Sequence, residues 1–318
     1  MPAKRKVGTV EIPAGVAETT LEPGGRGVHL TNLGKVFFAE AGYTKRDLLQ
    51  YYADVAPLLI PHVRERAMVM KRYPHGASGD FFFMKRTPPG APAWLRRCPI
   101  EHDSGSVIEF PIVDDVAALL WTINLGCIDL NQWYATCEDY GRPDYLHFDL
   151  DPVKDPAGGA TPFAVVRAGA LALRAALDGL AMPSYAKTSG SNGIHVYVPI
   201  VRGPLQHDVW RFAKALAFTL AKQHPDILTA EYKIAKRPQG RVLVDYNQNA
   251  WGRTLASVYS VRPNPFAGVS TPVTWDEIEA GFEIADFRLD NVRERFAATG
   301  DLWAPLLAKK RFDLTPFL

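Results

Sequence analysis

The segment HFDLDP, residues 147–152, combines acidic and apolar residues in strict alternation. If it forms a β-strand, His147, Asp149 and Asp151 share one face, because strand side chains alternate between two faces. Two carboxylates on one face repel each other, and a bound cation would remove that repulsion. Ligand sets made of oxygen alone suit Mg²⁺ or Mn²⁺. By itself, a D-x-D pattern is also compatible with an exposed edge pair or a helix-capping turn.

A third acidic residue, Asp245, ends the apolar run RVLVDY at residues 241–246. An acid that finishes a buried strand points toward a site at the strand end. Two-metal sites need such a further carboxylate. We therefore expect Asp149, Asp151 and Asp245 to hold two divalent cations, Mn²⁺ or Mg²⁺. Such a pair suits phosphoryl transfer, in which a hydroxyl is activated and pyrophosphate leaves.

A glycine- and serine-rich loop, KTSGSNG at residues 187–193, precedes a predicted strand that begins at Ile194 and His195. The loop offers small hydroxyls and free backbone amides next to a candidate cation, and such loops cradle phosphates. It is not a P-loop, because the G-x-x-x-x-G-K-[ST] pattern is missing. A plain turn between two strands, with a structural histidine, is the alternative.

These three motifs, in this order, resemble the polymerase domain of bacterial ATP-dependent DNA ligase D, a branch of the archaeo-eukaryotic primase superfamily. The likeness is colinear from about Asn32 to Pro265. It implies an α+β (mixed α/β) primase-polymerase fold, with central mixed or antiparallel sheets flanked by helices. It assigns the metals to the three aspartates. It assigns nucleotide contacts to Ser189, His195, Gln248 and Arg262, with Asn131, Lys187 and Asn192 beside them.

The same resemblance extends to the DNA. The segments TNLGKVFF and GYTK are similar to the family's pocket for the 5′-phosphate of a downstream strand, which implies a site made of Asn32, Lys35 and Lys45, joined by Lys71 of KRYP. Lysine amines and an asparagine amide are suitable donors for a phosphate. Phe82 and Phe83 match paired aromatics that stack on the template strand. Ordinary core packing is the alternative for both phenylalanines.

Two positions depart from the family pattern. Asn131 stands where ligase-linked members carry a histidine, and Asn192 stands where many relatives have lysine. Asparagine can neither become cationic nor take up a proton. No K-x-D-G ligase motif occurs in the sequence. We therefore expect a protein similar to the stand-alone mycobacterial primase-polymerases.

The expected function is that of a template-dependent nucleotidyltransferase in DNA repair, which fills short gaps or extends DNA ends and prefers ribonucleotides. Its expected partners are gapped or 5′-phosphorylated DNA, NTP or dNTP, a separate ATP-dependent DNA ligase and end-joining factors. Two alternatives stay open: a catalytically weak factor that binds DNA ends or gaps through a 5′-phosphate, and a metal-dependent phosphoesterase, since paired aspartates also serve hydrolysis.

Strands separated sometimes by helices and sometimes by turns favour an α+β fold. A T-x-x-D capping box at Thr44 predicts a helix that Pro61 ends. Further helices are expected at residues 116–124, 161–179, 205–223, 275–282 and 289–298, and strands at 68–72, 107–113, 145–151, 194–198, 241–246 and 254–261.

Composition fits a globular enzyme: 318 residues, 47% of them apolar and 22% charged, with a formal net charge of +2. Local basic clusters fit either solvated faces or a polyanion partner. We expect residues 1–29 to form an extended or poorly ordered arm and residues 30–318 a single catalytic domain. Three cysteines without C-x-x-C spacing predict reduced, structural thiols. With no signal or membrane segment in the pattern, a cytoplasmic, nucleoid-associated protein is expected.

Overall fold

The apolar strand segments that carry the acidic motifs collect in one six-stranded sheet, in the order β13-β14-β10-β12-β11-β15. The computed structural model describes all residues except 1–9, 103, 155–158 and 160. In the sheet only β13 and β14 pair in parallel, and the other neighbours are antiparallel. Its strands are β10 (Tyr145–Pro152), β11 (Tyr185–Thr188), β12 (Ile194–Pro199), β13 (Leu228–Thr229), β14 (Val242–Asp245) and β15 (Pro272–Val273).

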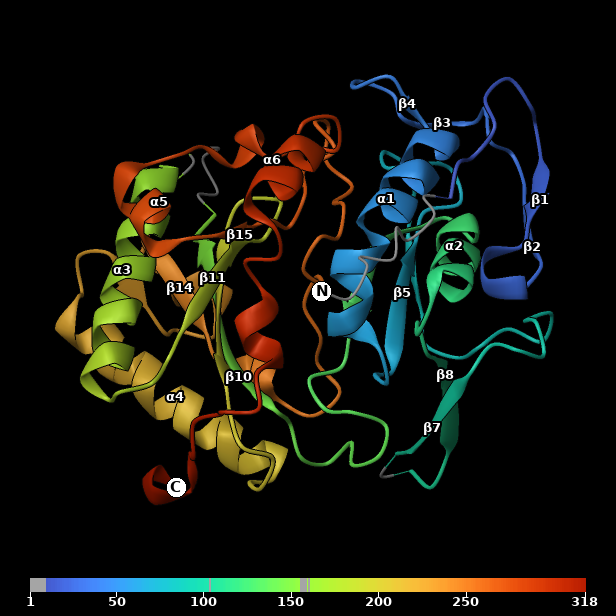
Figure 1. The fold of residues 1–318 in the computed structure, drawn as a ribbon. Coiled ribbons are helices and arrows are strands. Elements are labelled where there is room, and N and C mark those ends of the chain that lie inside the picture. Colours follow the sequence, from blue (N-terminus) through green and yellow to red (C-terminus); the bar gives the residue numbers. More distant parts are fainter. Residues whose placement is uncertain (1–9, 103, 155–158, 160) are drawn as a thin grey trace, which may run out of the picture.

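Two long amphipathic helices, α3 (Phe163–Gly179) and α4 (Gln206–Gln223), pack beside this sheet (Figure 1). Each buries one apolar stripe, which includes Leu173 and Leu177 on α3 and Leu220 on α4. The helices pack against β10, β12 and β14, and this packing fixes the positions of the strand ends that carry the acidic residues.

A second layer of structure lies on the other side of the molecule, around β5 (Met68–Arg72), β6 (Phe82–Met84) and β9 (Cys127–Gln132) (Figure 1). These strands form an antiparallel sheet in the order β6-β5-β9. Helices α1 (Lys45–Val63) and α2 (Val116–Asn124) pack on each other beside it. The predicted α+β fold, with mixed and antiparallel sheets flanked by helices, is confirmed.

The capping box at the start of α1 forms as predicted: the Thr44 side chain accepts from the Asp47 amide, and the Asp47 carboxylate accepts from the Thr44 amide. The predicted end of the helix was wrong, because α1 continues through Pro61 to Val63. A proline near the C-terminus removes only its own N–H from the ladder. The last turn is closed by a bond from the Arg64 amide to the Ile60 carbonyl, 2.9 Å.

The expectation of a poorly ordered arm before residue 30 was wrong for the residues that the structure describes. Strand β1 (Thr19–Leu21) pairs with β2 (Val28–Leu30), and Ile12 is fully buried. The Ile12 amide donates to Gln50 Oε1 at 2.8 Å, and its carbonyl accepts from Arg46 Nε at 3.0 Å. These contacts are made with α1, far along the chain, so local composition did not reveal them. Residues 1–9 lie outside the described part.

Two cysteines are paired, contrary to the prediction of reduced thiols. Cys98 on β7 (Arg97–Glu101) forms a disulfide with Cys137, with Cα atoms 5.7 Å apart. Spacing along the chain could not predict a pair separated by 39 residues that only the fold brings together. Cys127 is free and buried, as expected of a structural cysteine.

The predicted strand at residues 254–261 was also wrong, since this segment forms turns and a single bridge from Val261 to Val269. Tyr259 has a φ of 63°, which no strand accommodates. The backbone of this segment instead bonds to other elements. For example, the Ser257 amide donates to the Leu130 carbonyl of β9 at 2.8 Å.

The remaining elements are short. They are β3 (Val36–Phe38), β4 (Tyr43–Thr44), β8 (Val107–Pro111), α5 (Trp275–Ala280), α6 (Val292–Thr299), and the 3₁₀ helices η1 (Pro23–Gly25), η2 (Ile234–Lys236), η3 (Asn247–Asn249), η4 (Ile284–Asp286), η5 (Ala304–Leu307) and η6 (Thr315–Phe317). Among the described residues, none of the helices combines the length and the apolar character needed to cross a bilayer.

Candidate active site

Strand pairing brings the three acidic residues to one place. In the antiparallel pair β10–β14, Asp149 lies directly opposite Asp245, and directly opposed residues share a face of the sheet. Asp151 follows two residues later on β10 and so lies on that face as well. The structure therefore brings together the three carboxylates that the sequence singled out.

The environment of this group disfavours negative charge. Burial, followed by repulsion from Asp245, raises the pKa of Asp149 to about 7. Burial, followed by repulsion from Asp149 and Asp245, raises the pKa of Asp151 to about 8. Asp149 is only 5% exposed, and among the described residues its Oδ1 makes no well-formed hydrogen bond, its polar neighbour being His195 Nε2 at 3.2 Å. A buried carboxylate oxygen without a partner is costly unless a cation meets it.

The described part of the chain holds no group of three or more His, Cys, Asp or Glu side chains arranged to enclose a metal ion. The donor set nevertheless fits a hard cation that is only partly held by protein. Mg²⁺ is usually bound through one or two carboxylates, with water and substrate phosphates as its other ligands. The carboxylates supply oxygen ligands alone, of which one, Asp149 Oδ1, is unpaired.

The glycine-serine loop lies against the same strand. Gly193 has no room for a side chain, because a Cβ there would meet the Leu150 carbonyl oxygen at 2.5 Å and Asp151 Oδ1 at 2.7 Å. Gly190 has a φ of 72° and is equally crowded by the Ser270 amide, 2.7 Å from an added Cβ. The two glycines thus allow the loop to approach the carboxylates closely.

The expectation of free loop amides was wrong. The amides of Ser191, Asn192 and Gly193 all donate to Ser189 Oγ, at 3.1, 3.1 and 2.9 Å. Such a turn, in which a hydroxyl collects the following amides, is a local alternative that serine readily forms. Ser189 Oγ therefore accepts three bonds and keeps its own O–H to offer to a ligand.

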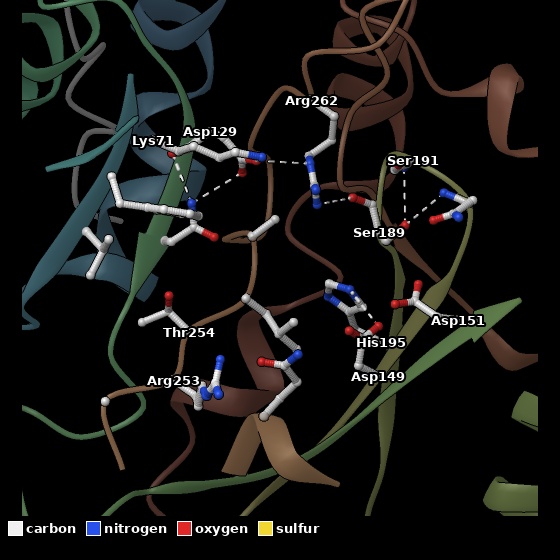
Figure 2. Close-up of a pocket in the computed structure, with 18 of the residues that line it drawn as sticks. Lys71, Asp129, Asp149, Asp151, Ser189, Ser191, His195, Arg253, Thr254 and Arg262 are labelled. Carbon is white, nitrogen blue, oxygen red and sulfur yellow. Dashed lines mark hydrogen bonds and ion pairs between the residues drawn. The ribbon is translucent and has the colours of Figure 1, made fainter. Parts of the chain in front are cut away.

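Arg262 connects the loop to the other side of the site (Figure 2). Its Nη1 donates to the Ser189 carbonyl at 3.0 Å, and its Nε lies 3.3 Å from Asp129 Oδ2. Asp129, on β9, is 1% exposed and also lies 3.9 Å from Lys71 Nζ. Sequence analysis missed Asp129, although an acid inside the apolar run CIDL was a signal, because unpaired acids are rarely buried.

A cavity of about 450 Å³ lies between these residues. Figure 2 shows Asp149, Asp151 and His195 on one side of it and Lys71 and Asp129 on the other, with Arg262 between them. The predicted residues that line it are Lys71, Phe83, Asn131, Asp149, Asp151, Ser189, Asn192, His195, Gln248 and Arg262. Among the lining residues that the sequence did not suggest are Lys85, Asp129, Ser191, Arg253 and Thr254.

Two of these lining residues also bond to acidic residues, and Lys187 lies behind the cavity wall. Gln248 Nε2 donates to Asp245 Oδ2 at 3.0 Å. The third carboxylate is thus hydrogen-bonded to a residue of the cavity wall. Asn131 Nδ2 donates to the Asp129 carbonyl at 3.0 Å. Lys187 is 1% exposed and lies behind His195.

The proposed phosphate-binding lysines form a separate cationic group. Burial, followed by the neighbouring charges of Lys35 and Arg72, lowers the pKa of Lys45 to about 8. Lys71, which the prediction grouped with Lys35 and Lys45, lines the central cavity instead. Its neighbour on β5, Arg72, points to the opposite face, as strand alternation requires.

The ammonium groups of this cluster are held by main-chain and amide oxygens. Lys45 Nζ donates to the Thr31 carbonyl at 2.7 Å and to Asn124 Oδ1 at 2.8 Å. Lys35 Nζ donates to the Pro74 carbonyl at 2.7 Å. Asn32, which precedes both lysines in the chain, has a left-handed φ of 56°.

Phe82 and Phe83 are exposed, at 46% and 57%, so they are not core residues. Strand alternation sends Phe83 to the central cavity and Phe82 away from it. The Arg72 guanidinium lies 5.2 Å from the Phe82 ring centre, and Lys71 Nζ lies 5.8 Å from that of Phe83. Exposed aromatics next to cations are suited to stacking on bases beside phosphates.

The chain is similar to known proteins over most of its length. Residues 44–303 match the family model of the LigD primase-polymerase domain. The multifunctional non-homologous end joining protein LigD of Mycolicibacterium smegmatis is 34% identical over 281 residues, which are 88% of this chain and 36% of that protein. The bifunctional LigD of Bacillus subtilis is 29% identical over 86% of this chain and 43% of its own length. The chain thus spans less than half the length of these relatives.

A solved structure, the polymerase domain of Mycobacterium tuberculosis ligase D in complex with DNA, is similar as well. It has a TM-score of 0.81 and 29% sequence identity, and the match covers 89% of this chain and 98% of that one. The family model covers most of the chain, and the described fold agrees with it. The chain therefore belongs to the LigD primase-polymerase domain family of nucleotidyltransferases.

Proposed function

We propose that this protein adds nucleotides to a DNA end, directed by a template, at Asp149, Asp151 and Asp245. The observation that carries the proposal is the strand register that sets Asp149 opposite Asp245, with Asp151 on the same face. Their crowding raises the pKa values of Asp149 and Asp151, which makes a divalent cation the natural partner of the group.

The three aspartates would hold Mn²⁺ or Mg²⁺, and the two-metal arrangement is part of the proposal. Bound there, such ions supply Lewis acidity that lowers the pKa of a 3′-hydroxyl and offsets the charge of the leaving pyrophosphate. The protein's own contribution is to orient the carboxylates through the β10–β14 pairing. Gln248 fixes one oxygen of Asp245 by donating to it.

The incoming triphosphate would lie against the glycine-serine loop and Arg262, which are joined by a hydrogen bond. Ser189 offers its hydroxyl, Arg262 its guanidinium and His195 its Nε2, all of which line the cavity. Asn192 and Asn131 are neutral donors in the same wall. Arginine is suited to phosphate because its fork presents several N–H groups in one plane.

The DNA would bind on the other side of the cavity. Phe82 and Phe83 would stack on template bases, and Asn32, Lys35 and Lys45 would hold the 5′-phosphate of the downstream strand. Lys71, in the cavity wall beside Phe83, would join them. The related Mycobacterium tuberculosis domain was solved in complex with DNA, which supports this part of the proposal.

The biological role that we infer is repair of broken DNA, in which the protein fills short gaps or extends ends together with a separate ligase. The names of the LigD relatives as non-homologous end joining proteins support it. A preference for ribonucleotides belongs to the same proposal. A single catalytic domain over residues 30–318 is likewise proposed.

The direct experiment uses a labelled duplex with a one-nucleotide gap and a 5′-phosphate, incubated with Mn²⁺ and single NTPs or dNTPs. The proposal expects extension by the templated nucleotide, and more of it with the NTP. Shortening of the labelled strand would instead favour a phosphoesterase. A gel shift without product would favour a DNA-end binding factor.

The variant Asp149→Ala/Asp151→Ala should lose extension and still bind the gapped duplex. Asp226→Asn, at an exposed acid in the turn after α4, is the matched control and should keep activity. Extension by the double variant at the wild-type rate would contradict the mechanism.

A further inference from the structure

Lys187 is a lysine whose ammonium group is buried under the active site. The side chain is 1% exposed on β11, and its Nζ has three neighbours at hydrogen-bond distance. They are His195 Nδ1 at 2.7 Å, Ser270 Oγ at 2.7 Å and the Ala256 carbonyl at 2.9 Å. A lysine ammonium has three N–H groups, so these contacts use all of them. Lys187 therefore has no donor left for a nucleotide, although the sequence suggested that role.

The direction of each bond can be assigned. Ser270 Oγ donates its own hydrogen to the Thr188 carbonyl at 2.8 Å, so toward Lys187 it can only accept. The Ala256 carbonyl is an acceptor by nature. The third neighbour, His195, is the one group of the three whose hydrogen can sit on either of two atoms.

The far side of the His195 ring decides between the two forms. Its Nε2 lies 3.2 Å from Asp149 Oδ1. An ionised carboxylate only accepts hydrogen bonds, and two bare acceptors at that distance repel. On the near side, the Lys187 ammonium can only donate, so Nδ1 is the acceptor and the ring hydrogen belongs on Nε2.

We propose that Lys187 is a positioning residue for nucleotide addition, which holds the His195 ring in place and keeps a hydrogen on its Nε2, at the cavity wall beside Asp149 Oδ1. When a bound cation takes up the Asp149 oxygens, that hydrogen is available to an oxygen of the triphosphate. This inference rests on the proposed function for the contact between His195 and nucleotide. Lys187 itself touches no substrate, and its effect passes through His195.

The first test needs no activity. The ¹⁵N NMR signals of the His195 ring, assigned through their loss in His195→Gln, report which nitrogen carries hydrogen. With Mg²⁺ and a non-hydrolysable nucleoside triphosphate bound, hydrogen on Nε2 and none on Nδ1 is expected. Hydrogen on Nδ1 would overturn the proposal. If the ring is as expected while the wild type adds no nucleotide, the proposed function fails and this assignment stands.

The second test is a double-mutant cycle. Lys187→Met keeps the length of the side chain and removes its donors, and kcat for single-nucleotide addition should fall about 10- to 100-fold, as is typical when the partner that orients an active-site histidine is removed. Because Lys187 acts through His195, the same change in a His195→Ala background should have little further effect. Equal losses in both backgrounds would overturn the proposal.

Controls separate positioning from stability. Lys222→Met, at an exposed lysine in the last turn of α4, should leave kcat unchanged. The KM for gapped DNA should change less than about twofold in Lys187→Met, because the DNA-binding side of the cavity is untouched. If Lys187→Met does not fold, the NMR measurement on the wild type still decides.

Discussion

The two walls of the central cavity are built on opposite principles. On the wall made by β10, β12 and β14, Asp149 and His195 are buried and are fixed by strand register and by a buried lysine, while Asp151 and Asp245 are half-buried. On the wall that includes β6, Phe83 is exposed, and Phe82 on the other face of that strand is exposed as well. The difference indicates that the first wall is preorganised for chemistry and the second is open to a large, variable ligand.

The difference between the two walls predicts different effects for variants in each of them. Changes in the buried wall should reduce the rate of nucleotide addition and spare DNA binding. Changes in the open wall should weaken DNA binding and spare the rate at saturating DNA.

The largest effect is expected for Asp245→Asn. The amide keeps the shape of the side chain but removes the charge that lies opposite Asp149. Because a metal cation stabilises transition-state charge by several kcal/mol, kcat should fall roughly 10²- to 10⁴-fold. Single-turnover extension of the gapped duplex measures this fall in rate, with Asp226→Asn as the matched control. If Asp245→Asn also raised the Kd for DNA by a similar factor, the buried wall would serve DNA binding as well as rate, contrary to the account.

An intermediate effect is expected for Phe83→Ala. Loss of one stacking partner typically costs about 1 to 3 kcal/mol, so the Kd for gapped DNA should rise about 5- to 150-fold, with kcat retained at saturating DNA. Fluorescence anisotropy gives the Kd. Phe218→Ala removes a comparably exposed phenylalanine from α4 and should leave the Kd for gapped DNA and kcat unchanged. Unchanged affinity in Phe83→Ala would show that this wall does not stack on bases.

The smallest effect is expected for Lys35→Ala. Its ammonium lies in the cationic cluster near Lys45 but is itself exposed. The preference for a 5′-phosphorylated over an unphosphorylated gap should shrink by about tenfold or less, since exposed charge contacts are screened by salt. The slope of log Kd against log salt should also fall by about one. If Lys35→Ala kept the preference for the 5′-phosphorylated gap, Lys35 would not be part of the 5′-phosphate pocket.

Sequence alone predicted what depends on local periodicity. The alternation in HFDLDP placed Asp149 and Asp151 on one face of β10, and the capping box located the start of α1 within a residue. The glycines of the loop were noticed as well, and close packing gives the physical reason for them: Gly193 lies against β10 and Gly190 against Ser270.

What the sequence could not supply is non-local. The Cys98–Cys137 pair, the packing of Ile12 on α1 and the position of Asp129 beside Arg262 all join segments distant in the chain. The segment at 254–261 has the composition of a strand, but Tyr259 takes a left-handed conformation, and Ser257 is held by β9. Tertiary contacts override propensity at such places.

The most direct test of the central claim is Mn²⁺ binding measured by electron paramagnetic resonance at several pH values, in the presence of a non-hydrolysable nucleoside triphosphate. The pKa values of Asp149 and Asp151 are raised to about 7 and about 8, so near neutrality protons compete with the metal. Binding should therefore strengthen as pH rises from 6 to 8, by up to about tenfold per pH unit for each proton displaced. In Asp149→Asn/Asp151→Asn, binding should be weak and independent of pH, and binding as tight as that of the wild type would contradict the account.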